Sequence, residues 1–139
     1  MYIAMNEFKI VLGRENDFEQ LWRNRESYLG NVEGFIKFNL LKGSTNDDYT
    51  VYISHSLWTS KGDFTNWTKS ESFRLAHKDA GKNSQNYVGH PVFEGYEVVV
   101  WVLSKKEFVK FVFLIEGSKK NLTIFLIFKG KDGNKKRSF

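Results

Sequence analysis

The chain has 139 residues, no cysteine and no long apolar run. Without cysteine it has no disulfide, no thiolate to offer a metal and no cysteine nucleophile. No apolar run approaches the ~20 residues that a membrane-spanning helix needs, so we expect no transmembrane segment. Glu7, Lys9, Arg14 and Glu15 precede any long apolar run, and we therefore expect no secretory signal peptide and an intracellular, cytoplasmic protein.

Several cofactor and catalytic motifs are also missing. The glycines do not form the strand–GxxxxGK[ST]–helix phosphate loop, and there is no HExxH motif or clustered metal-ligand spacing. The chain also has no flavin or nicotinamide motif. Glu15, Asp17 and Glu19 suit the first turn of a helix, where acidic side chains interact favourably with the helix dipole. They need no catalytic explanation.

The net charge of +5 is unevenly distributed. From Ser104 onward there are ten Lys and Arg against three Asp and Glu, which leaves residues 1–103 with a net charge of −2. The body of the protein therefore has no basic surface of the kind that binds nucleic acid. With 41% hydrophobic and 17% aromatic residues, it is not a disordered type of chain. We expect one domain over residues 1–103 and a separate extension over 104–139.

The apolar pattern predicts an alternation of strands and helices. We expect strands at 2–11, 35–41, 49–58 and 93–103, and a turn at 43–48. A helix is predicted over 14–29, ending at Gly30-Asn31, and two shorter helices over 61–69 and 71–78 with Ser60 and Ser70 as N-caps. Residues 80–92 have loop composition. The order βαββαβ predicts a ferredoxin-like α+β fold, and two such sheets packed face to face would form a dimeric α+β barrel.

The extension over 104–139 has a different character. Two apolar runs, 108–115 and 122–128, are followed by a basic stretch from Lys129 to Arg137. Three interpretations remain open: an added β-hairpin, a poorly ordered and self-associating segment, or a membrane-surface segment. We assign no enzyme chemistry to it.

Three chemically different residues stand out in the body of the chain. Asn6 interrupts an apolar strand, although asparagine is depleted in strands. Trp67 follows Phe64 by about one helical turn. His77 shares a helix face with Phe73 and Ala76, which lie four and one positions before it.

These residues also carry a family resemblance, over roughly residues 1–100. The segments that carry it are Ala4-Met-Asn6-Glu-Phe, Val32-Glu-Gly-Phe35, Leu57-Trp58, Phe64-Thr-Asn-Trp67-Thr-Lys-Ser70 and Phe73-Arg-Leu-Ala-His77-Lys. They resemble the antibiotic biosynthesis monooxygenase (ABM) superfamily, in particular its heme-degrading IsdG-type and Bacillus-type branch. The resemblance implies a homodimeric enzyme that opens the heme macrocycle with dioxygen and electrons from an external reductant or reductase.

The resemblance also implies a role for each residue. His77 would be the axial ligand of the heme iron, Trp67 would press on the porphyrin and distort it, and Asn6 would donate a hydrogen bond to the iron-bound oxygen. Each has an ordinary alternative: a histidine that packs or caps a helix end, a core tryptophan, and a satisfied structural asparagine near a bulge. The other expected heme contacts are Phe64, Phe73, Ala76 and Arg74.

The alternatives extend to these contacts and to the function itself. Arg74 and Lys78 could meet the heme propionates or form a solvated helix face. His55 and His90 do not match the ligand position of the family.

The predicted function is heme degradation, with heme as both substrate and cofactor. The two alternatives are a cofactor-free ABM oxygenase of polycyclic phenols or quinols and a non-catalytic heme-binding dimeric barrel. Binding of membrane or nucleic acid by the basic extension is a further, weaker alternative.

Overall fold

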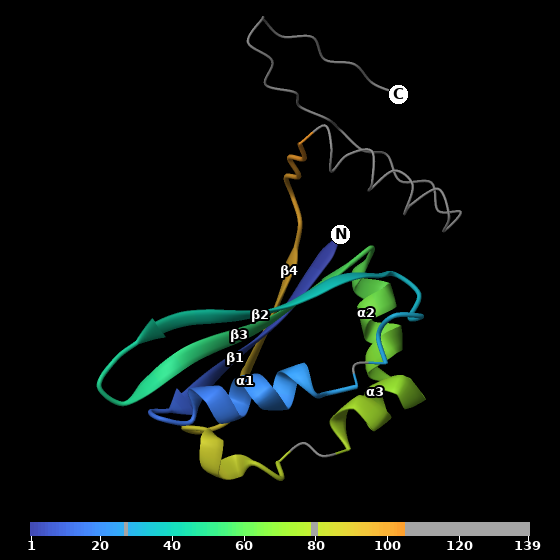
Figure 1. Ribbon diagram of the computed structural model, residues 1–139. Helices are drawn as coiled ribbons and strands as arrows, with labels where there is room; N and C mark the ends of the chain where they lie inside the picture. The colour runs from blue at the N-terminus through green and yellow to red at the C-terminus, as the bar shows by residue number, and fades with distance from the viewer. Residues whose placement is uncertain (27, 79–80, 105–139) are drawn as a thin grey trace, which may run out of the picture. The chain divides into compact units, whose positions relative to one another are not determined.

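The computed structural model describes residues 1–26, 28–78 and 81–104. Residues 1–97 form one compact unit in which the helices cover one face of an antiparallel sheet (Figure 1). The elements are β1 (Tyr2–Val11), α1 (Glu15–Arg23), β2 (Phe35–Thr45), β3 (Tyr49–Trp58), α2 (Lys61–Thr68), α3 (Glu71–His77), the 3₁₀ turn η1 (Ser84–Asn86) and β4 (Val92–Glu97). This order confirms the predicted ferredoxin-like α+β fold, in which the second helix of the motif is split into α2 and α3.

The sheet has the strand order β2-β3-β1-β4, so β1 and β3 are its central strands. β1 pairs with β3 without a break from Tyr2 opposite Trp58 to Val11 opposite Tyr49. β4 pairs with the first part of β1. Because side chains alternate between the two faces of a strand, the even-numbered residues of β1 and β3 point toward the helices.

The core on the helix-covered face consists of two aromatic clusters. One contains Tyr2, Ala4, Leu29 and Trp58, and the other contains Phe8, Ile10, Phe18 and Tyr52. Along β1 the two clusters are separated by a single even-numbered position, Asn6, which is only half-buried. The core is therefore interrupted in the middle of the sheet, at the polar residue that stood out in the sequence.

Three element ends differ from the prediction by several residues. β2 continues to Thr45 rather than ending at residue 41, because its pairing with β3 extends to Thr45 opposite Thr50. α1 ends at Arg23 rather than near residue 29, because the positions one turn after Trp22 are the charged Arg25 and Glu26. Leu29 is buried as expected, but against the first cluster and outside the helix. β4 ends at Glu97 rather than at residue 103, because Glu97 pairs with Tyr2, the first residue of β1.

Both predicted N-caps are confirmed. The Ser60 hydroxyl accepts a hydrogen bond from the Asp63 amide at 3.1 Å, and the Ser70 hydroxyl accepts one from the Phe73 amide at 3.2 Å. These bonds satisfy backbone donors that the first turn of each helix leaves unpaired. Together they fix where α2 and α3 begin.

The extension lies almost entirely outside the described residues, which include Ser104 but not 105–139. The domain boundary after residue 103 therefore stays a prediction. Within residues 1–26, 28–78 and 81–104, no helix combines the length and the apolar character needed to cross a membrane.

Gly34, the residue directly before β2, offers a test of the packing between this turn and α2. Its φ of +77° is strained for other residues, and a Cβ there would overlap the buried Asp63 side chain. We expect Gly34→Ala to lower the free energy of unfolding by roughly 2–4 kcal/mol in a urea titration. Gly30→Ala is the matched control, because a Cβ at Gly30 meets no atom within 4 Å. Equal stability of the two variants would contradict this account.

Candidate functional site

The candidate site is built on a continuous line of aromatic rings that leads from the sheet to the end of α3. Trp58, fully buried at the end of β3, packs against Trp67 of α2 with ring centroids 5.2 Å apart. The Trp67 ring meets Phe73 of α3 edge-on at 4.9 Å. Phe73 in turn stacks on His77 at 4.0 Å. Such pairs favour one relative orientation of the rings, so the imidazole is held in a defined direction.

The His77 ring is also oriented by a hydrogen bond. Its Nδ1 lies 2.8 Å from the carbonyl oxygen of Phe73. A carbonyl oxygen only accepts, so Nδ1 carries the proton and donates it, and the lone pair of the neutral ring is on Nε2. This is the tautomer in which a histidine binds a metal through Nε2.

Burial lowers the pKa of His77 below the ordinary value of 6.5. The bond to the Phe73 carbonyl acts in the opposite direction, and the nearby charge of Arg25 lowers the pKa further. Because burial disfavours the charged form of the ring, the imidazole stays neutral at neutral pH. A neutral ring is the form that can serve as a ligand.

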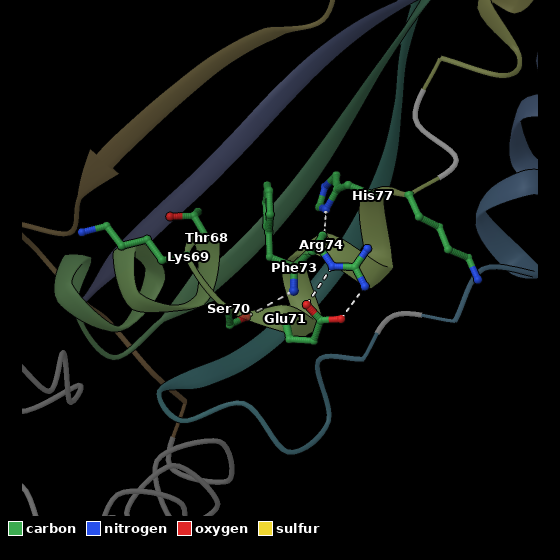
Figure 2. A pocket seen from close by; sticks show the side chains of 8 residues that line it. Thr68, Lys69, Ser70, Glu71, Phe73, Arg74 and His77 are labelled. Carbon is green, nitrogen blue, oxygen red and sulfur yellow. Dashed lines mark hydrogen bonds and ion pairs between the residues drawn. The ribbon is translucent and has the colours of Figure 1, made fainter.

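A hollow of about 600 Å³ opens beside α3 (Figure 2). Its lining includes three of the predicted site residues, Phe73, Arg74 and His77. The rings of Phe73 and His77 project from the same side of α3, away from Arg74 (Figure 2). Arg74 forms a two-pronged ion pair with Glu71, and both side chains are about two-thirds exposed. Its role toward a propionate stays a prediction.

The other predicted residues lie outside this hollow. Phe64 and Trp67 belong to the aromatic line, with their ring centroids 5.9 Å apart. Ala76 lies on α3 directly before His77, and its carbonyl oxygen accepts a hydrogen bond from Arg25. The buried indole nitrogen of Trp67 has no hydrogen-bond partner among the described residues.

Asn6 lies on the helix-covered face of the sheet, between the two core clusters. Its direct neighbours across the strands are Ser54 on β3 and Phe93 on β4. The Phe93 ring stacks on Phe64 at 5.8 Å, which connects the position of Asn6 to the aromatic line. In the described part of the chain no hydrogen bond engages the Asn6 side chain. Its amide is thus available to a ligand.

The other two histidines are placed elsewhere. His55 is an odd-numbered residue of β3 and points to the sheet face opposite the helices, where Met5 and Asn39 are its direct neighbours. His90 is exposed in the loop before β4. Neither shares the face on which Asn6 and the aromatic line lie.

Two residues at the site were not predicted from the sequence. Phe93 closes the aromatic line from the edge strand, and Arg25 connects the end of α1 to the end of α3. The only signal for Arg25 was a charged residue one turn after Trp22, where the apolar stripe of α1 stops.

The sequence of this chain is similar to that of one known protein family. Residues 1–79 match the antibiotic biosynthesis monooxygenase family. A protein of Halalkalibacterium halodurans named heme-degrading monooxygenase is 30% identical over 100 residues, which is 72% of this chain and 84% of that protein. The chain therefore belongs to the antibiotic biosynthesis monooxygenase family.

Two solved structures share the fold at lower identity. The heme-degrader MhuD from Mycobacterium tuberculosis, solved with two hemes in its active site, has a TM-score of 0.57 and 20% identity over 73% of this chain and 99% of that one. A mutant of SnoaB, a cofactor-independent oxygenase from Streptomyces nogalater, has a TM-score of 0.54 and 14% identity over 74% of this chain and 98% of that one. Both confirm the fold.

The lowered pKa of His77 leads to a prediction for the ligand-free protein. An NMR titration of the ring should give a midpoint below 6.5. The folded state then binds fewer protons than the unfolded chain, so His77 should stabilise the fold less as the pH falls below 6.5. A midpoint at or above 6.5 would contradict the burial described here.

Proposed function

We propose that this protein is a heme-degrading monooxygenase that opens heme with dioxygen and external electrons and releases iron and a linear tetrapyrrole. The observation that most strongly supports heme as the substrate is His77, a half-buried neutral imidazole with Nδ1 engaged and its Nε2 lone pair available at the end of an aromatic line. The relative named heme-degrading monooxygenase supports the same chemistry.

The residues present fit a heme. A porphyrin is a flat apolar ring system, and the rings of Phe73 and His77 line the hollow beside α3, with Trp67 packed edge-on against Phe73. The Nε2 atom of His77 would hold the iron. The buried indole N–H of Trp67 lacks an acceptor among the described residues, so it could donate a hydrogen bond to a bound ligand.

Each residue then has a distinct task. His77 would hold the iron, and Trp67 and Phe64 would contact and distort the macrocycle. Asn6 would donate an amide N–H toward the bound substrate without changing its own charge. Bound heme supplies the redox-active iron and the carbon skeleton that is oxidised. The electrons come from an external reductase or reductant, and we propose that the protein works in the cytoplasm, where such donors are available.

The strongest competing function is a cofactor-free oxygenase that acts on a polycyclic phenol or quinol. The fold shared with SnoaB favours it, since the same Asn and Trp would contact a flat aromatic substrate. His77 would then be a base or a structural residue. A non-catalytic heme-binding barrel is the third function, and it would use the same aromatic rings and ligand without turnover.

A hemin titration separates the three functions. We expect saturable binding near one heme per chain, followed by loss of the Soret band and release of iron when ascorbate is added in air with catalase present. His77→Ala should weaken binding by at least about tenfold, because it removes the axial ligand. His90→Ala is the matched control. A Soret band that persists under several reductants would favour the heme carrier, and absence of binding would favour the cofactor-free oxygenase.

Asn6 should affect turnover much more than binding. We expect Asn6→Ala to slow heme loss by on the order of 10²-fold, as when one preorganised hydrogen-bond donor is removed from an active site, with little change in hemin affinity. Single-turnover rates and hemin dissociation constants measure the two effects separately. Equal loss of affinity and rate would contradict the assigned role. Ser54→Ala is the control, because it removes the polar side chain directly opposite Asn6 on the same face of the sheet.

We also propose that the protein is a homodimer formed through the sheet face opposite the helices. No described helix covers this face, and several apolar side chains on it are partly exposed: Ile3, Met5, Leu41, Ile53, Val92 and Tyr96. Lys37 on β2 and Glu94 on β4 share this face near its opposite edges. A two-fold partner would bring opposite charges together when β4 of one copy faces β2 of the other.

The dimer is tested by placing a charge on this face. Leu41 is 43% exposed in the single chain, so Leu41→Glu should leave the fold intact but convert the dimer to a monomer in sedimentation velocity. Leu21→Glu on α1, where Leu21 is 37% exposed, is the control and should remain dimeric. A Leu41→Glu protein that sediments as a dimer would overturn the proposal.

A further inference from the structure

Helix α3 carries His77 but has little hydrophobic anchorage. It is seven residues long and none of its side chains is fully buried. Isolated helices of this length are unstable in water, so contacts with the rest of the protein must hold α3 in place. Its N-terminal end is fixed by the Ser70 cap and its middle by the packing of Phe73 against Trp67.

The C-terminal end of α3 is held by a residue from another part of the chain. The guanidinium of Arg25 donates a hydrogen bond to the carbonyl oxygen of Ala76, the residue before His77. The last carbonyls of a helix lack partners within the helix, and a cation there also interacts favourably with the helix dipole. Arg25, which follows α1 by two residues, therefore acts as a C-terminal cap for α3.

Arg25 is itself held in place by stacking. Its guanidinium carbon lies 4.9 Å from the centroid of the Trp22 ring, a cation–π contact. Trp22 stacks in turn on Phe38 of β2, with centroids 5.3 Å apart and an interplanar angle of 15°. The contacts thus run from the edge strand through Phe38, Trp22 and Arg25 to the backbone beside His77.

We propose that Arg25 is a positioning residue for the axial ligand: by capping α3 at Ala76, it sets the orientation of His77 toward the heme. The inference rests on the proposed role of His77, but its structural part concerns the ligand-free protein. Only a side chain with donors and a planar face can stack on Trp22 and reach the Ala76 carbonyl at once, a geometry that suits arginine better than lysine.

The first experiment measures amide hydrogen exchange in the ligand-free protein. Arg25→Met keeps an unbranched stem over Trp22 but removes the donors, so we expect exchange of the amides from Leu75 to Lys78 to accelerate by about tenfold while the amides of β1 and β3 keep their protection. Arg25→Lys should restore part of the protection. Arg23→Met is the control, because Arg23 is an exposed arginine of α1 that pairs with Glu19.

The second experiment measures the orientation of the ligand in the heme-bound protein. The ferrous iron–histidine stretching band in resonance Raman should shift in Arg25→Met and return toward the wild-type frequency in Arg25→Lys.

Unchanged exchange of α3 in Arg25→Met would overturn the inference, even if heme affinity fell, because Arg25 would then act directly on the ligand. A wild-type iron–histidine band in Arg25→Met would overturn it as well. Heme binding unaffected by His77→Ala would instead overturn the proposed function, and it would leave the exchange result standing.

Discussion

The packing of Trp67 on Trp58 is the contact on which the candidate site depends. Trp58 is fully buried at the end of a central strand, and Trp67 of α2 packs on it and continues the aromatic line to Phe73. Aromatic pairs of this kind contribute about 0.5–1.5 kcal/mol beyond the area that they bury. Phe73 and His77 join the aromatic line through Trp67, so the packing on the sheet helps to set the direction of the imidazole.

The same sheet contains a polar interruption that packing does not explain. Asn6 and Ser54 lie opposite each other on the core face, where the flanking positions of β1 are Ala4 and Phe8. A half-buried amide without a partner lowers stability relative to an apolar side chain. Departures of this kind from the local pattern are expected at functional sites. The role of Asn6 stays a prediction, to which the structure adds that the side chain is half-buried on the core face of the sheet.

The sequence predicted those parts of the fold that local patterns determine. Enrichment in apolar and aromatic residues along 2–11 and 49–58 predicted the two central strands, and Ser60 and Ser70 predicted the helix starts. The end of β4 depends on where its partner strand begins, and no local pattern contains that information. The pairing of Arg25 with Ala76 spans 51 residues and could not be predicted for the same reason.

The choice between an oxygenase and a heme carrier depends on Asn6 rather than on His77. The aromatic line and a neutral imidazole would bind a heme equally well in either protein, so they explain affinity alone. An unengaged amide on the core face adds nothing to the binding of a flat apolar ring and reduces stability. It becomes useful when charge develops on an oxygen during reaction, because a fixed N–H then stabilises that charge without reorganisation. The cost in stability therefore favours the catalytic function over storage.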